Sequence, residues 1–209
     1  MKKLNKKGFT LVELLAVITI MGILMLVAIP AIARTIENSR RDTFLNTAKT
    51  YINAIKNSIS QDEAEVDGKG ISAAEAGYYY YFFDSADVSG HDLVDEGGKS
   101  AWGNIEVRGH IVVHKTITEA GKPKYEYAII MVDEKGRGIG TANTSGVPTK
   151  VYSEKVLRRN NVKSSDTTGD SGENRAKFYE TKAAPANGTT VWDSGDAVSA
   201  DFGVITIAG

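Results

Sequence analysis

The sequence predicts an α+β protein in which a long amino-terminal α-helix precedes a globular head built on an antiparallel β-sheet. Two observations predict the helix: residues 14–33 carry no formal charge, and apolar residues then recur at three- and four-residue intervals to about residue 61. β-branched and aromatic runs between residues 105 and 133 predict the sheet. With 209 residues, 42% of them hydrophobic, the chain has room for one globular domain and an appendage.

The first half of the predicted helix is long enough to cross a membrane. Its 20 uncharged residues, 14–33, would form roughly 30 Å of helix, the thickness of a bilayer core. Four lysines among the first seven residues would keep the amino terminus in the cytoplasm and place everything after Arg34 outside. A cleaved secretory signal peptide fits less well, because the apolar run exceeds the usual ~7–15 residues and contains Pro30.

Glu13 is the only acid in the first 36 residues. A carboxylate at the edge of the hydrocarbon is costly unless it is protonated or paired. No Lys, Arg or His lies between residues 8 and 33 to pair with it. An uncleaved membrane anchor would explain the rest of the segment but not this residue. We therefore expect that Glu13 has a functional role.

The second half of the helix, residues 34–61, is predicted to be amphipathic and to pack on the head. Its apolar face consists of Ile36, Phe44, Leu45, Ala48, Ile52, Ile55 and Ile59. Charged residues occupy the other faces, and no proline or glycine interrupts the pattern between residues 31 and 61. One helix of about 50 residues from Phe9 to about Gln61 is therefore expected.

In the head, residues 62–209, the clearest signal is for strands at residues 105–107, 110–118 and 125–133, with a hairpin loop at residues 119–124. A short helix is expected at residues 71–77, another at residues 151–159, an exposed loop at residues 161–174 and a closing strand at residues 204–207. The aromatic cluster Tyr78–Phe83 predicts a strand or loop packed under the domain, with a subunit contact, an adhesive patch or ligand stacking as alternatives.

Composition and spacing argue against several kinds of chemistry. The chain has no cysteine, which excludes a disulfide framework, a thiolate metal site and a cysteine nucleophile. His110 and His114 have the spacing of zinc ligands on a helix, but the intervening residues predict a strand, on which they would lie about 13 Å apart. The glycines at residues 136–140 predict a turn rather than a phosphate-binding loop.

A local basic stretch comes late in the head: Lys150, Lys155, Arg158, Arg159 and Lys163. It predicts a solvated face, and the alternative is a surface for DNA or another anionic partner. The acidic balance left once the amino-terminal lysines are set aside does not favour general nucleic-acid binding. No catalytic arrangement can be assembled, so we expect that the chain is not an enzyme and needs no cofactor.

Residues 6–15, from Lys6 through Gly8, Phe9 and Glu13 to Leu15, resemble the class III signal of type IV pilins and pseudopilins. The resemblance implies that a prepilin peptidase removes the leader, residues 1–8, between Gly8 and Phe9 and methylates the new amino group of Phe9. It also implies that Glu13 of one subunit pairs with the Phe9 amino group of its neighbour in a filament core formed by residues 9–33. Such a pair would offset the cost of a lone desolvated charge.

The resemblance supplies the remaining expectations about function. The chain would be a structural subunit of a type IV pilus, held in the membrane before assembly and in a surface filament afterwards, with copies of itself, other pilins, an assembly platform and its ATPase as partners. Gly22 and Pro30 lie where the family has helix-weakening residues, and their segment would extend in the filament. Because it has no cysteine, the chain resembles the cysteine-free pilins of monoderm bacteria. Many pilins of diderm bacteria instead hold their carboxy-terminal region with a disulfide.

Three alternatives remain open. The chain could be a pseudopilin of a type II secretion or DNA-uptake system, a membrane-anchored adhesion module that does not polymerise, or an anchored enzyme. A plain anchor should tolerate the change Glu13→Ala, whereas a filament subunit should lose assembly.

Overall fold

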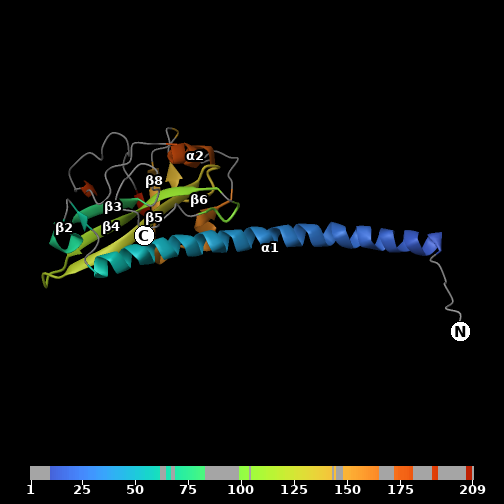
Figure 1. Ribbon diagram of the computed structural model, residues 1–209, viewed down its shortest axis with the longest axis horizontal. Helices are drawn as coiled ribbons and strands as arrows, with labels where there is room; N and C mark the ends of the chain where they lie inside the picture. The colour runs from blue at the N-terminus through green and yellow to red at the C-terminus, as the bar shows by residue number, and fades with distance from the viewer. Residues whose placement is uncertain are drawn as a thin grey trace, which may run out of the picture. The chain divides into compact units, whose positions relative to one another are not determined.

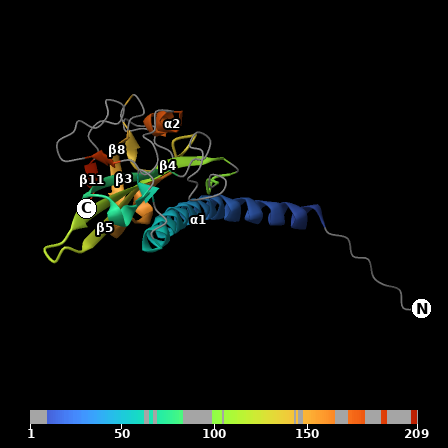
Figure 2. The same ribbon diagram turned by 60° about the vertical axis from the view of Figure 1, so that its left-hand side comes forward.

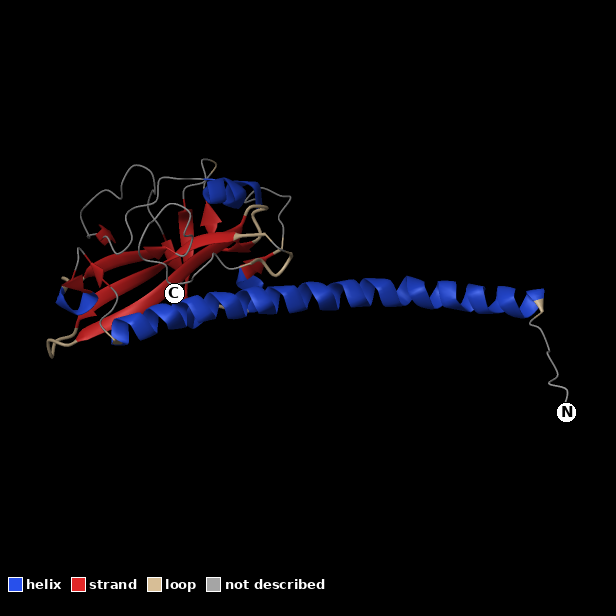
Figure 3. Cartoon of the chain, viewed as in Figure 1, coloured by secondary structure: helices blue, strands red, loops and turns tan. Residues whose placement is uncertain are grey.

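The computed structural model describes residues 10–61, 65–66, 69–82, 99–103, 105–142, 144, 148–164, 172–180, 190–192 and 206–208. These residues form one long helix, α1 (Leu11–Ser60), and an antiparallel sheet of several strands (Figures 1 and 3). The predicted α+β class and the 50-residue helix are therefore confirmed. The chain divides into two compact units, Met1–Ser39 and Arg40–Gly209, which are described separately.

The first unit consists, in its described part, of the amino-terminal portion of α1. Every side chain from residue 10 to residue 36 is exposed, including large apolar ones such as Leu11 and Leu26. By length and composition α1 could cross a membrane. The helix runs through Gly22 and Pro30 without interruption.

In the second unit, the remainder of α1 packs on one face of the sheet (Figures 1 and 2). Its buried residues recur at helical spacing: Phe44, Leu45, Ala48, Tyr51, Ile52 and Ile55. They meet alternate residues of the central strands, Ile111, Val113, Ile129 and Met131 among them, because side chains on a strand alternate between faces. The predicted amphipathic face is confirmed except at Ile36, which is exposed, and Tyr51 joins it.

The sheet is built around a hairpin of two 11-residue strands, β4 (Val107–Ile117) and β5 (Pro123–Asp133). Strand order is β10-β3-β4-β5-β6-β9, with β3 (Gly77–Phe82), β6 (Gly138–Ile139), β9 (Val162–Lys163) and β10 (Thr190–Trp192). Strand β8 (Pro148–Ser153) pairs with β5, with β7 (Thr141–Ala142) and, in parallel, with β11 (Thr206–Ala208). Strands β1 (Glu65–Val66) and β2 (Lys69–Gly70) form a separate small sheet.

Short helices complete the second unit. Three are single 3₁₀ turns: η1 (Ile71–Ala73), η2 (Glu154–Val156) and η3 (Arg159–Asn161). The α-helix α2 (Gly172–Glu180) lies on the side of the sheet opposite α1 (Figures 1 and 2). The short helix predicted at residues 71–77 is confirmed only at its start, because β3 begins at Gly77.

The predicted hairpin is confirmed, but its loop is shorter than predicted, because Pro123 and Lys124 already belong to β5. The aromatic cluster forms β3, with Tyr79 and Tyr81 buried against α1. Phe83 lies outside the described residues. The separate strand predicted at residues 105–107 is wrong. Val107 opens β4 itself, and Glu106 makes only an isolated bridge to Lys99.

Two further predictions in the carboxy-terminal half are wrong. Residues 151–159 do not form a helix, because Val151–Ser153 complete β8 between three partner strands and the chain then makes the turns η2 and η3. Residues 161–174 are not one exposed loop, since Val162 is buried in β9 and α2 begins at Gly172. The closing strand is present as Thr206–Ala208, while residues 204–205 lie outside the described part.

Candidate functional site: the amino terminus of helix α1

The described part of the chain begins with a helix cap that involves Glu13. The backbone N–H and the hydroxyl of Thr10 both donate to Glu13 Oε2, each at 2.8 Å. In return, the Glu13 backbone N–H donates to Thr10 Oγ1 at 3.3 Å. This reciprocal pattern is a capping box, with Thr10 as the N-cap and Glu13 three residues later.

The cap gives Glu13 a partner inside its own chain. Its carboxylate also lies in the first turn of α1, where the positive end of the helix dipole favours a negative charge. Both Thr10 contacts use Oε2, and a carboxylate has about four acceptor positions. The cap is therefore compatible with a further contact from another molecule.

Sequence reasoning missed this cap, although the signal was present. A threonine followed three residues later by glutamate, just before an apolar run, is the pattern that predicts a capping box. Gly8 and Phe9, the predicted cleavage and methylation positions, lie outside the described residues, so their predicted roles stay predictions.

Beyond the cap, α1 offers an uninterrupted apolar surface. All side chains of residues 14–33 are exposed, and a Cβ added at Gly22 would meet nothing within 4 Å. Such a surface must be covered by lipid or by other protein. The predicted extension of the Gly22 to Pro30 segment in a filament stays a prediction.

In the head, His110 and His114 lie on the same face of strand β4, as the alternation predicted. His110 is fully buried, and this burial lowers its pKa to about 3. The His114 ring stacks on Tyr78 of the neighbouring strand, with 4.2 Å between ring centroids. Among the described residues, no three His, Asp or Glu side chains converge as a metal site would require.

The basic stretch is partly neutralised by carboxylates. Arg159 makes two hydrogen bonds of 2.5 Å to Asp42 of α1, which raise the pKa of Arg159. Lys155 donates to Glu126 of β5 at 2.7 Å, and this hydrogen bond, with that from Lys124, lowers the pKa of Glu126. Ion pairs that join separate elements favour a structural role for these two cations over a nucleic-acid surface.

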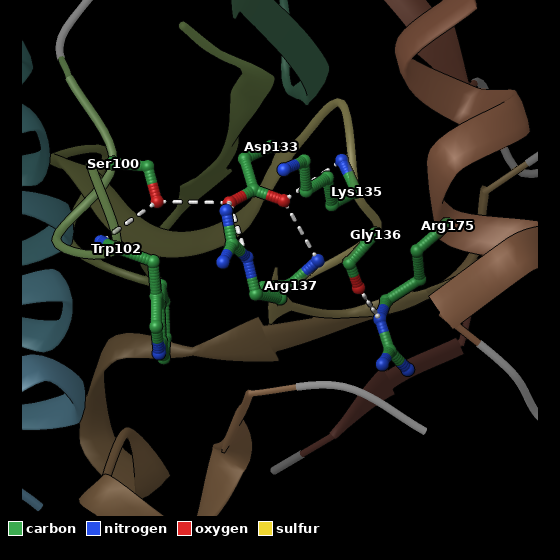
Figure 4. A network of polar contacts seen from close by, with 7 residues as sticks. All are labelled: Ser100, Trp102, Asp133, Lys135, Gly136, Arg137 and Arg175. Atoms are coloured by element: carbon green, nitrogen blue, oxygen red, sulfur yellow. Dashed lines mark hydrogen bonds and ion pairs between the residues drawn. The ribbon is translucent and has the colours of Figure 1, made fainter. Parts of the chain in front are cut away.

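A turn follows β5 as predicted, but it lies at residues 134–137, because Gly138 and Ile139 form β6. It is built on the buried carboxylate of Asp133 (Figure 4). Asp133 accepts hydrogen bonds from the Ser100 hydroxyl at 2.8 Å and from the backbone N–H groups of Lys135 and Arg137 at 3.0 and 2.9 Å. The guanidinium of Arg137 also donates to it, with Nε at 2.8 Å from Oδ2. With all these partners Asp133 organises the turn and is not an exposed reactive group.

The carbonyl of Gly136 in the same turn accepts a hydrogen bond from Nε of the buried Arg175 of α2, at 2.7 Å. The turn after β5 therefore joins the 99–103 segment and α2 to the central hairpin (Figure 4).

Comparison with known proteins finds a match at the amino terminus. Residues 3–29 match the family model described as the prokaryotic N-terminal methylation motif. No curated protein and no solved structure matches the chain. The motif supports a type IV pilin- or pseudopilin-like protein, and the long helix joined to an antiparallel sheet is a pilin-like architecture. This chain thus carries the class III signal of type IV pilins at its amino terminus.

Proposed function

We propose that this protein is a structural subunit of a type IV pilus or a related filament, polymerised through its amino-terminal helix. The observation that carries the proposal is the methylation motif joined to a helix whose apolar residues are all exposed from residue 11 to residue 33. In the membrane, lipid covers this surface. In a filament, the same surface of neighbouring subunits covers it.

Processing begins with the leader, residues 1–8. Prepilin peptidase cleaves between Gly8 and Phe9, and methylation follows on the new amino group of Phe9. Residues 9–33 then form the filament core, residues 34–61 connect it to the head, and residues 62–209 form the outer surface. No cofactor takes part.

Assembly depends on Glu13. Its carboxylate caps the helix of its own chain through Oε2 and accepts the Phe9 ammonium of a neighbouring subunit. A matched pair of charges in a desolvated core favours one register between subunits, because a misaligned subunit would leave both charges unpaired.

Three variants separate pairing from capping. Glu13→Gln removes the charge but keeps a side chain that can complete a capping box, whereas Glu13→Ala removes both. Thr10→Ala removes the hydroxyl of the cap and keeps the charge. Each variant is expressed with a cognate assembly system, surface filaments are sheared off and quantified by mass spectrometry, and the mature amino terminus is sequenced.

We expect all three variants to be cleaved before Phe9, and only Thr10→Ala to give filaments at close to the wild-type amount. If Glu13→Gln assembles normally, the carboxylate serves the cap and the pairing mechanism is wrong. A mature chain that begins at Met1 or Arg34 would refute the whole proposal.

The same mass spectrometry assigns the finer role. A chain that dominates the surface filaments is a major pilin. A chain found in trace amounts at the surface, and needed for secretion or DNA uptake, is a minor pilin or pseudopilin. A chain that stays in the membrane in cells with active assembly is an anchored module.

A further inference from the structure

Helix α1 repeats a seven-residue pattern along the part that packs on the sheet. Residues 43–49 read TFLNTAK and residues 50–56 read TYINAIK. Thr, Asn and Lys thus recur unchanged seven residues apart, while Phe and Leu of the first copy become Tyr and Ile in the second. Seven residues, or two turns, is the repeat at which a helix meets a second helix.

Packing on the head accounts for one side of this repeat. Its aromatic and aliphatic members are buried: Phe44, Leu45, Tyr51 and Ile52. Six exposed residues lie on the other side, and we call them the Thr-Asn stripe: Thr43, Asn46, Thr50, Asn53, Asn57 and Ser60. Burial in the head therefore explains why the apolar members recur, but it does not explain why the exposed threonine and asparagine recur.

The composition of the Thr-Asn stripe suits a contact with protein. Its three- and four-residue spacing is common to any exposed helix face, but such faces are typically charged, and none of these six residues is. Two hydroxyls already donate to their own helix, Thr50 Oγ1 to the carbonyl of Asn46 at 3.0 Å and Ser60 Oγ to that of Lys56 at 2.8 Å. They can therefore leave water without losing these hydrogen bonds.

The asparagines favour a second copy of the same helix as the partner. A side-chain amide carries both donors and an acceptor, so one asparagine can pair with another. A copy shifted along the helix by one repeat, about 10.5 Å, places its Asn53 opposite Asn46. The same shift places Thr50 of that copy opposite Thr43, so the repeat is complementary to itself.

The charges beside the Thr-Asn stripe favour a parallel pair of helices. By helical geometry Lys49 and Lys56 lie along one margin of the stripe, and Thr47 and Ala54 lie along the other. In a parallel pair opposite margins meet, so each lysine faces an uncharged residue. In an antiparallel pair like margins meet, and Lys49 would face Lys56. Subunits that all polymerise through the same end of α1 are parallel.

We propose that the Thr-Asn stripe is a contact between the α1 helices of neighbouring subunits, which lie parallel and are shifted by one seven-residue repeat. This inference rests on the proposed polymerisation. Amide contacts are weak one by one, but the apolar half of α1 already holds the subunits together, so the stripe acts at a high effective concentration. Its role is to fix the shift, as asparagines fix the register of paired helices.

Because the chain has no cysteine, engineered cysteines test the shift directly. The double variant Asn46→Cys/Asn53→Cys is expressed with a cognate assembly system. Sheared filaments are oxidised mildly and separated by denaturing gel electrophoresis. Position 46 of one subunit should lie within disulfide reach of position 53 of the next, with Cα atoms at most about 7 Å apart. We expect a ladder of covalent multimers, and no dimers from Asn46→Cys alone.

The matched control is Asn46→Cys/Lys122→Cys, which has its second cysteine in the exposed β4–β5 turn. A ladder from this control alone would show that a neighbouring head covers the stripe, and it would overturn the proposal. The proposal is also overturned if filaments of Asn46→Cys/Asn53→Cys give no ladder. Dimers of Asn46→Cys alone in similar yield would show unshifted helices, with the same consequence.

A second variant, Asn53→Lys, tests whether the stripe is buried between subunits. Lysine is a better helix former than asparagine, so the Tm of the full chain in detergent should not decrease. In the filament the added ammonium would lose water without gaining a counterion, so sheared filaments should decrease at least about tenfold. Lys122→Gln should leave both quantities unchanged. Wild-type amounts of filament from Asn53→Lys would contradict the contact, whereas a wild-type chain that forms no filaments would refute the proposed function itself.

Discussion

Replacing Gly136 by alanine tests whether the turn after β5 holds α2 against the head. Gly136 has φ +72°, in the region that favours glycine. A Cβ there would lie 1.5 Å from the carbonyl oxygen of Gly172, the first residue of α2. Gly121, in the β4–β5 turn, provides a matched control: its φ is also +72°, but an added Cβ would meet nothing within 4 Å.

The two glycines allow the conformational and steric contributions to be separated. Alanine in the left-handed region costs about 1–2 kcal/mol, so Gly121→Ala should lower the free energy of unfolding by that amount. Gly136→Ala has the same conformational cost. In addition, its Cβ would overlap the carbonyl of Gly172, and only displacement of α2 or of the turn can relieve this overlap. Displacement would break the hydrogen bond from Arg175 to the Gly136 carbonyl, which adds about 1.5–3 kcal/mol.

The expected total for Gly136→Ala is about 2.5–5 kcal/mol, or about 2 kcal/mol more than for Gly121→Ala. In a unit of this size the difference should lower the Tm by a further 4–8 °C or so. Thermal unfolding of the full chain in detergent, followed by near-ultraviolet circular dichroism, measures it. Equal losses for the two variants would refute the docking of α2 on this turn.

Two other predictions concern the buried polar side chains of Lys115 and His110. Lys115 is 1% exposed, and its ammonium donates to the carbonyls of Ile71, Ser72 and Ala74 at 2.9, 2.9 and 2.6 Å. Lys115→Met should therefore destabilise the head by about 2–4 kcal/mol in denaturant titrations, and a loss as small as that of exposed Lys122→Met would contradict this role. Burial lowers the pKa of His110 to about 3, against about 6.5 in the unfolded chain. The unfolded state thus binds the proton more readily than the folded state. The contribution of neutral His110 to the free energy of unfolding is therefore fully present above pH ~6.5. As the pH decreases from there, the free energy of unfolding decreases by up to about 1.4 kcal/mol per pH unit. The variant His110→Leu should lose this component of the slope, and an unchanged pH profile would show that other groups cause it.

The elements that sequence predicted well are those specified by local pattern. Helix α1 follows from an uncharged run and a helical repeat without proline or glycine after residue 30, and the β4–β5 hairpin follows from two β-branched runs around a Gly-Lys-Pro turn. The capping box of Thr10 and Glu13 was equally local and could have been predicted.

Strand β8 shows why the rest could not be predicted. Val151, Tyr152 and Ser153 are compatible with a helix or a strand, and they form a strand because β5, β7 and β11 pair with it. These partners lie in other parts of the chain. The hydrogen bond from Ser100 to Asp133 likewise joins residues far apart in sequence, whose proximity no spacing rule reveals.

Buried polar groups connect the peripheral segments of this cysteine-free head to its central hairpin. Lys115 fixes η1, Asp133 fixes the 99–103 segment, and Arg175 fixes α2. A disulfide would hold its two segments together even in the unfolded chain, whereas these contacts exist only when the surrounding residues are folded and exclude water. Each link therefore depends on the sheet, and each segment should be released when its own link is removed. Since the Asp133–Arg137 turn carries two of the three links, damage to that turn should loosen more of the head than the loss of Lys115.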